Sequence, residues 1–342
     1  MKKNLFGILL IFFCSLILVV SATHKVYAEE KVIMKISASG AGMKATYGNE
    51  LVNRFKYLAE LYSNYEIEVK IYPHGAFGDA SEAALAVRNG ECHLMNHASN
   101  NFAVHAPSMN AFSLPYMFDS YEQAFNFTDG PFGEVIRKKA YEEAGVRLVA
   151  FHRGGWRGIA NSKRPIEKLE DLQGLKIRVP PSPIYIEMFK AWGVNPVTIG
   201  WMETFTSLQQ RVADGFENPM GVVGTFKFYE IQKYYTWCKY VAQIAVVILN
   251  DEFYTGLSPD HKDAVDLALK ETIQWLNGYV DWSDNKWAKI SESKGMILYD
   301  LPDEEEARWA EKARAQWPKL YKMCGGKEWV ERFDKAVKQA KK

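Results

Sequence analysis

The first half of the chain alternates short stretches patterned like β-strands with longer stretches patterned like helices. Apolar residues recur at every second position in Ile67–Ile71 and at helical spacing from Tyr47 to Tyr62. Asp79 and Glu82 form a capping-box pattern before a short helix that Gly90 closes. Further strands are predicted over residues 32–36, 92–96 and 146–151, with a helix over 134–144. This alternation predicts a parallel sheet covered by helices on both faces.

The second half continues the α/β pattern from Gly154-Gly155 onward. Residues 175–179 alternate apolar and basic side chains, which predicts a half-buried strand. Val241–Leu249 is a continuous apolar run of the kind that lies centrally in a sheet. Ser258 and Pro259 are typical of an N-cap and a first helical turn, and helical spacing extends from there to Lys289. A helix of this length could span two bodies.

The chain has 342 residues, and single hydrophobic cores stop growing near ~250–300 residues. We therefore expect an α/β protein with two lobes, each a mixed sheet flanked by helices, and a long helix that spans both. Lobe I is predicted to comprise residues 29–153 plus 244–283, and lobe II residues 154–243 plus 284–342. The chain is expected to cross between the lobes near His152–Gly155 and Gln243–Ile244.

The first 28 residues have the layout of a secretory signal peptide. Lys2 and Lys3 precede a nearly unbroken apolar run over Leu5–Val20, and Val26-Tyr27-Ala28 follows. We expect cleavage after Ala28 and export to the periplasm. An uncleaved membrane anchor is the alternative, since the apolar run is just long enough to span a bilayer.

Composition and motifs exclude several classes of function. The formal charge of +1 provides no basic field for nucleic acid. The sequence contains no G-x-S-x-G, H-E-x-x-H or G-x-x-x-x-G-K motif, so no enzymatic activity is predicted. The cysteines are scattered, and the seven histidines are dispersed. We expect no metal and no cofactor.

One glycine-rich loop competes with this interpretation. Residues 40–45, GAGMKA, lie between the first predicted strand and the first helix and match a relaxed dinucleotide-binding fingerprint. The fingerprint requires an acidic residue at the end of the second strand, where the chain has Ile71-Tyr72-Pro73-His74. An oxidoreductase is therefore the weaker alternative.

Arg178 raises a separate question, because it lies in a strand that two prolines terminate. The simpler interpretation is a strand with one solvent-exposed face, since charged residues are mostly exposed. However, Arg157, Trp201 and Asn218 also lie at the edges of regular elements. Ligand clefts in open α/β sheets gather at such strand ends.

The order of these segments resembles the extracytoplasmic solute-binding subunits of tripartite ATP-independent periplasmic (TRAP) transporters, over essentially the whole mature chain. The matching segments are Gly75-Ala76-Phe77-Gly78-Asp79, Leu114-Pro115-Tyr116-Met117-Phe118, Trp156-Arg157, Asn161-Ser162-Lys163-Arg164-Pro165-Ile166, Gly174-Leu175-Lys176-Ile177-Arg178-Val179-Pro180, Trp201-Met202-Glu203 and Asp214-Gly215-Phe216-Glu217-Asn218-Pro219.

The resemblance implies a periplasmic-binding-protein fold that captures a small organic carboxylate and works with the membrane subunits of a TRAP transporter. Arg178 would form a two-point salt bridge with the carboxylate, and Asn218 would donate a further hydrogen bond. Arg157 would bind the polar end of the ligand, and Trp201 would pack on its body. A sensor or scavenger with the same fold is the other possibility.

The remaining candidates complete the predicted pocket. Trp156 is a second tryptophan that could stack on the ligand, and a place in a lobe core is its alternative role. The loop over residues 96–101 varies within the family that the sequence resembles and would shape the rest of the pocket. Its candidates are His97, Ser99 and Asn100.

Overall fold

The computed structural model describes residues 31–38, 46–73 and 75–340. The predicted signal peptide, residues 1–28, and the glycine-rich loop of residues 40–45 lie outside the described residues. No helix within the described ranges is both long enough and apolar enough to cross a membrane.

Ten strands of the described chain are joined edge to edge in the order β2-β1-β3-β9-β4-β7-β5-β6, with β8 paired to β4 and β10 paired to β8. The strands are β1 (Val32–Ser37), β2 (Ile67–Tyr72), β3 (Leu94–Ala98), β4 (Arg147–Asn161), β5 (Lys176–Val179), β6 (Asn195–Thr198), β7 (Gly215–Pro219), β8 (Tyr234–Trp237), β9 (Ala242–Leu249) and β10 (Ile297–Asp300).

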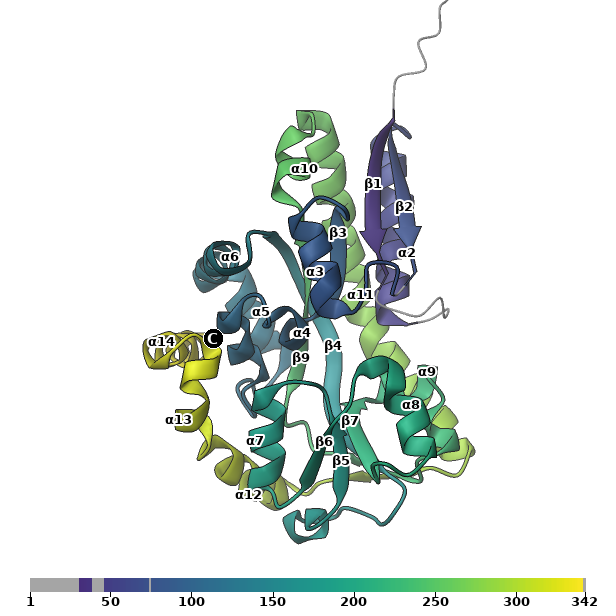
Figure 1. Ribbon diagram of the computed structural model, residues 1–342, viewed down its shortest axis with the longest axis vertical. Coiled ribbons are helices and arrows are strands. Elements are labelled where there is room, and N and C mark those ends of the chain that lie inside the picture. Colours follow the sequence, from purple (N-terminus) through teal and green to yellow (C-terminus); the bar gives the residue numbers. More distant parts are fainter. Residues whose placement is uncertain (1–30, 39–45, 74, 341–342) are drawn as a thin grey trace, which may run out of the picture. The chain divides into compact units, whose positions relative to one another are not determined.

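Strand β4 changes partners along its length. Residues 147–156 pair with β9, whereas residues 157–161 pair with β7 on one side, and residues 159–161 also pair with β8 on the other. The register shifts between Arg153 and Trp156, where Gly155 adopts φ +90°. A Cβ on Gly155 would lie 2.6 Å from the Cβ of Pro219, so this close approach requires glycine. The fold is two-lobed, and in Figure 1 β4 lies between the two groups of strands.

The predicted parallel sheet of the first half is only partly present. β1 and β3 are parallel, but β9 lies between β3 and β4 and is antiparallel to both. The prediction treated these strands as neighbours in chain order. The apolar run of β9, almost entirely buried, instead gains partners on both sides by inserting between them, as its sequence pattern indicated.

Helices flank both groups of strands (Figure 1). The α-helices are α2 (Tyr47–Tyr62), α3 (Ala80–Arg88), α4 (Ser99–Phe102), α5 (Tyr121–Asp129), α6 (Pro131–Ala144), α7 (Pro183–Ala191), α8 (Trp201–Gln209), α9 (Met220–Thr225), α10 (Asp251–Gly256), α11 (Pro259–Ser293), α12 (Asp303–Arg314), α13 (Trp317–Leu320) and α14 (Lys327–Gln339). Short 3₁₀ helices are η1 (Pro107–Ser113), η2 (Leu169–Leu172), η3 (Phe228–Glu230) and η4 (Tyr321–Cys324).

The predicted long helix is confirmed as α11, which has 35 residues. The Ser258 side chain accepts a hydrogen bond from the His261 N–H, and Pro259 occupies the first turn, as the sequence indicated. The helix ends at Ser293 rather than Lys289. It packs against α2 at one end and α9 at the other, so it contacts both groups of strands (Figure 1).

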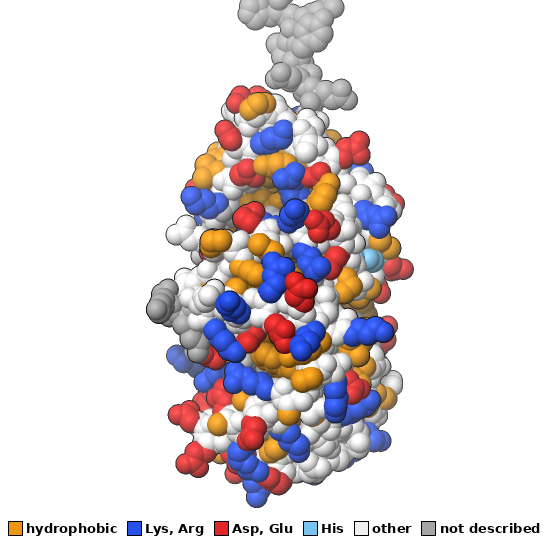
Figure 2. Space-filling model, turned by 90° about the vertical axis from the view of Figure 1, so that its left-hand side faces the viewer, with side chains coloured by type: hydrophobic (Ala, Val, Ile, Leu, Met, Phe, Trp, Pro, Cys, Tyr) orange, Lys and Arg blue, Asp and Glu red, His pale blue; other side chains and the backbone are white. Residues whose placement is uncertain are grey.

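Aromatic side chains dominate the core beside the first group of strands. Phe112 packs on Phe127 and, edge to face at 5.0 Å, on Phe333 of α14. Residues 320–337 thus join this core, although the predicted lobe II includes them; the lobe boundaries stay a prediction. Charged side chains of both signs are interspersed on the face shown in Figure 2, as the near-neutral formal charge of +1 suggests.

Candidate functional site

A cavity of about 370 Å³ lies where the two groups of strands meet. Residues of β3, α4 and β9 line it from one group, and residues of β5, β7 and α8 line it from the other. The carboxyl ends of the parallel strands β5 and β7 reach this cavity, which is the usual position of a ligand cleft in an open sheet. The predicted residues that line it are His97, Asn100, Arg157, Arg178, Trp201 and Asn218.

Arg178 is buried, with only 2% of its surface exposed, although it lines the cavity. Its Nε donates to the Ile199 carbonyl at 2.9 Å, which fixes the guanidinium plane. It forms no salt bridge with any residue in the described ranges. Burial lowers the pKa of Arg178 to about 10, so the side chain stays charged at neutral pH. The structure therefore holds a buried cation without a paired carboxylate.

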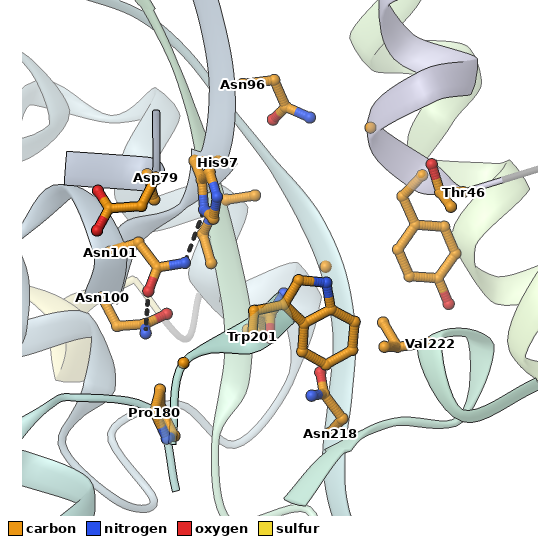
Figure 3. A pocket seen from close by; sticks show the side chains of 18 of the residues that line it. Thr46, Asp79, Asn96, His97, Asn100, Asn101, Pro180, Trp201, Asn218 and Val222 are labelled. Atoms are coloured by element: carbon orange, nitrogen blue, oxygen red, sulfur yellow. Dashed lines mark hydrogen bonds between the residues drawn. The ribbon is translucent and has the colours of Figure 1, made fainter. Parts of the chain in front are cut away.

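Asn218 and Trp201 lie next to this cation in the lining. Arg178 is in register with Phe216 on the parallel strand β7, so Asn218, two residues further on, projects from the same face. Within the described chain the Asn218 side-chain amide has no hydrogen-bond partner. The Trp201 ring lies 5.8 Å from the Arg178 Cζ and packs edge to face on Phe226. Figure 3 shows Trp201 and Asn218 on the same side of the cavity.

Arg157 differs from Arg178 because its charge is already paired. Its Nε and Nη2 bind the two carboxylate oxygens of Glu217, with an Nη2–Oε1 distance of 2.6 Å, and its Nη1 donates to Gln243. Burial opposes the charge of Arg157, but the Glu217 carboxylate outweighs it and holds its pKa above the ordinary value. Tyr240 also donates to Glu217. Arg157 thus belongs to a neutral buried pair at the wall of the cavity.

The side chains of His97, Asn100 and Asn101 form a hydrogen-bonded chain on the opposite side of the cavity (Figure 3). Asn100 Nδ2 donates to Asn101 Oδ1 at 3.0 Å, and Asn101 Nδ2 lies 2.8 Å from His97 Nδ1. The Ala98 N–H also donates to His97 Nδ1, at 3.0 Å. The His97 Nδ1 is thus an acceptor at the edge of the cavity.

Two predicted residues do not line the cavity. Trp156 packs edge to face on Tyr121 at 5.3 Å and borders the first core, the alternative role that the sequence left open. Ser99 is buried at the first position of α4. Its neighbour Asn100 is the residue of that turn that reaches the cavity.

Several residues that line the cavity were not predicted from the sequence. Gln243, which was predicted only as part of a crossing between the lobes, accepts a hydrogen bond from Arg157 and so orients it. Asn96 lies next to His152, whose Nε2 is 2.6 Å from the Asn96 Oδ1. Burial lowers the pKa of His152 to about 4, which disfavours a charge on this ring. Asp79 and Glu203 line the cavity as exposed carboxylates. Asp79 was interpreted only as a helix cap and Glu203 only as part of a segment that carries the resemblance, so neither was predicted to line the cavity.

Asp284 of α11 connects two elements beside the cavity. Its carboxylate accepts from the Tyr47 hydroxyl of α2 and from the Gly221 N–H of α9, the latter at 2.7 Å. A Cβ on Gly221 would lie 1.7 Å from the Tyr47 hydroxyl oxygen, so only glycine permits this approach. Burial raises the pKa of Asp284 to about 7, and the Asp281 charge adds to the rise.

We expect the Asp284→Asn variant to gain stability relative to the parent protein as the pH rises from 5 to 8. The folded-state pKa of Asp284, about 7, lies above its ordinary 3.8, so folding favours the protonated form and loses that contribution as pH rises through 7. Between pH 5 and pH 8 the loss amounts to about 3 kcal/mol, because about two pKa units separate pH 5 from the folded-state pKa of about 7 and each is worth about 1.4 kcal/mol. Urea midpoints of both proteins at pH 5 and pH 8 measure it. A difference independent of pH would contradict the prediction.

Within the described ranges, no three His, Cys, Asp or Glu side chains gather in a way that could hold a metal ion. The site is instead a cavity between two lobes, built around a buried cation and amide side chains. The fold and the site together define a two-lobed solute-binding protein.

Similarity to known proteins identifies the family of this chain. The family described as "Bacterial extracellular solute-binding protein, family 7" matches residues 38–323, so the chain belongs to this family. The resemblance to TRAP solute-binding subunits is confirmed, and family members are periplasmic binding proteins rather than enzymes.

Individual relatives support the assignment. The chain is 33% identical over 64% of its length to the 2,3-diketo-L-gulonate-binding periplasmic protein YiaO of Escherichia coli (strain K12), of which it spans 66%. The galactonate complex of the sugar acid binding protein DctPAm of Advenella mimigardefordensis superposes with a TM-score of 0.85 at 26% identity, over 91% of this chain and 99% of that one. A TRAP periplasmic solute binding protein of Ralstonia eutropha H16 with bound (S)-2-acetolactate gives 0.82 at 27% identity, over 90% and 99%.

Proposed function

We propose that the protein captures a small organic carboxylate between its lobes and delivers it to the membrane subunits of a TRAP-type secondary transporter. The observation that carries this proposal is the buried guanidinium of Arg178, which lines the cavity and has no salt-bridge partner in the described chain. A guanidinium offers two parallel N–H groups that match the two oxygens of a carboxylate. The ligand would supply the missing anion.

The neighbouring residues fit the same role. The free amide of Asn218 can donate to the bound carboxylate, and the Trp201 ring can cover the ligand body. The ligands named for the three relatives each carry a carboxylate. The signal peptide would be cleaved after Ala28 on export. The lobes would close about the bend in β4 and present a joint surface to the membrane subunits.

The test is calorimetric titration with matched pairs of a carboxylic acid and its primary amide, after a thermal-shift screen has found a binding acid. A ligand at 100 times its dissociation constant stabilises the protein by about 2.7 kcal/mol, which such a screen detects. We expect the amide to bind at least about 30-fold more weakly, since it cannot pair with a cation. Equal affinities would refute carboxylate recognition.

Delivery to a transporter needs a separate measurement in cells. Deletion of the gene should abolish uptake of the labelled ligand, and the wild-type gene should restore it. Uptake that persists undiminished in the deletion strain would instead favour a sensor or scavenger.

A further inference from the structure

The charges and amides of the cavity restrict the part of the ligand that Arg178 does not bind. We infer that the site selects a polyhydroxylated monocarboxylate and rejects dicarboxylates. This inference rests on the proposed function, because it takes one ligand carboxylate to be paired with Arg178.

The basic side chains of the cavity lining limit how many ligand carboxylates can be paired. The Arg157 guanidinium is neutralised by Glu217, and the His97 Nδ1 accepts a hydrogen bond from the Ala98 N–H. Burial lowers the pKa of His152 to about 4, which disfavours its charged form. Among the arginine and lysine residues that the structure describes in the lining, Arg178 is therefore the one without a paired carboxylate. A second ligand carboxylate would find no further guanidinium or ammonium partner among these residues.

Two carboxylates of the lining oppose a second negative charge on the ligand. Asp79 and Glu203 both line the cavity, and neither forms a salt bridge with a residue that the structure describes. Asp79 caps α3 through one oxygen, which accepts from the Ser81 and Glu82 N–H groups at 2.8 and 3.0 Å. A dianionic ligand would bring its second charge toward these carboxylates, so the field of the cavity opposes it.

Amide side chains of the lining can form hydrogen bonds with hydroxyl groups of the ligand. Asn100 uses its amide N–H on Asn101, which leaves its Oδ1 without an assigned donor in the described chain; Asn218, whose N–H is proposed to bind the ligand carboxylate, keeps its Oδ1 as an acceptor. These two side chains are 8% and 7% exposed. Amides and carboxylates together suit hydroxyls, which both donate and accept. Buried amides left unpaired cost free energy, so a ligand without hydroxyls would bind poorly.

One wall of the cavity is apolar. Trp201 extends across the cavity in Figure 3 and rests on Phe226, with Val222 nearby in the lining. An aromatic ring on one side and polar groups on the other match a carbon chain with C–H groups on one face and hydroxyls on the other. A fully polar or fully apolar ligand would leave one wall unmatched.

The experiment is calorimetric titration with four related six-carbon probes. These are gluconate, glucarate with a second carboxylate, hexanoate without hydroxyls, and glucitol without a carboxylate. Galactonate, galactarate and galactitol repeat the comparison with another stereochemistry, and succinate is added as a dicarboxylate without hydroxyls. We expect at least one of the two aldonates to bind, and its dicarboxylate to bind about 100-fold more weakly or worse. Hexanoate should be weaker by about 100-fold or more, because hydroxyl-binding groups stay unpaired.

Variants separate charge rejection from shape. Asp79→Asn keeps the helix cap, since asparagine caps equally well, and Glu203→Gln keeps the side-chain length. Each should raise the affinity for the dicarboxylate relative to the aldonate about threefold, as expected for an exposed charge. Glu122→Gln is the matched control, since Glu122 is also an exposed residue in a first helical turn but lies outside the cavity lining. It should leave the ratio unchanged.

The outcomes distinguish the two proposals. If glucitol or galactitol binds as tightly as its acid, the proposed carboxylate recognition fails. If the alditols do not bind but the dicarboxylates, succinate or hexanoate bind as tightly as the aldonates or more tightly, carboxylate recognition stands and the present inference is overturned. Failure of both aldonates in the presence of another binding carboxylate also overturns it.

Discussion

Replacing Arg178 with methionine is expected to abolish useful ligand binding and to stabilise the ligand-free protein. Truncating one partner of a buried charge pair costs 2–5 kcal/mol or more, so the affinity should fall by about 30-fold at least. The empty site, by contrast, holds this cation at a cost, since burial lowers its pKa from 12.5 to about 10. At about 1.4 kcal/mol per pKa unit the cost is about 3 kcal/mol, partly offset by the hydrogen bond to Ile199. Calorimetry and urea unfolding measure the two effects.

Two further variants test whether the planar fork of Arg178 is what matters. Arg178→Lys keeps the charge but loses the paired N–H groups, so it should not restore binding. Lys176→Met is the control, because Lys176 lies on the same strand with an exposed side chain outside the cavity lining. It should leave both affinity and stability unchanged. Wild-type affinity in Arg178→Met would contradict the proposed site.

Glu217→Gln is expected to be strongly destabilising. Glu217 is fully buried and accepts from both Arg157 and Tyr240, so the neutral amide would leave the Arg157 guanidinium buried without its counterion. Breaking a buried pair in this way costs about 3–5 kcal/mol. The midpoint of urea unfolding should therefore fall sharply, with the slope unchanged.

A double replacement identifies the cause of that loss. Arg157→Met combined with Glu217→Leu removes both charges, and such apolar replacements are often neutral or stabilising, so much of the stability should return. Glu170→Gln is the control, because its ion pair with Arg308 is about half exposed and should leave the midpoint unchanged. If the double variant is no more stable than Glu217→Gln, the unpaired charge is not the cause.

Local patterns in the sequence predicted most elements of the fold. The capping box at Asp79, the N-cap at Ser258 and the central apolar strand before Asn250 depend on neighbouring residues, and all three are present. The antiparallel insertion of β9 was not predictable in the same way. It depends on which distant strands meet, and pairing between remote segments leaves no periodic signal in either of them.

The site was predictable only where a residue conflicted with its local pattern. Arg178 stood out because an arginine in a strand that prolines terminate needs an explanation, and the structure places it in the cavity lining. Lys176 belongs to the same alternation and is exposed, so the pattern alone did not separate the two. Gln243 and Asn96 lie in ordinary strands, and only the tertiary arrangement gives them a role.

A single backbone segment, β4, is shared by both groups of strands, and this limits how they can move. Residues 147–156, on both sides of the Gly154-Gly155 bend, pair with β9, whereas residues 157–161 pair with β7 and, from Ile159, with β8. Sliding one group past the other would break these ladders, whereas a change of torsion angles at the bend would leave them intact. A rotation about this bend is therefore the motion of β4 that we expect to open and close the cavity.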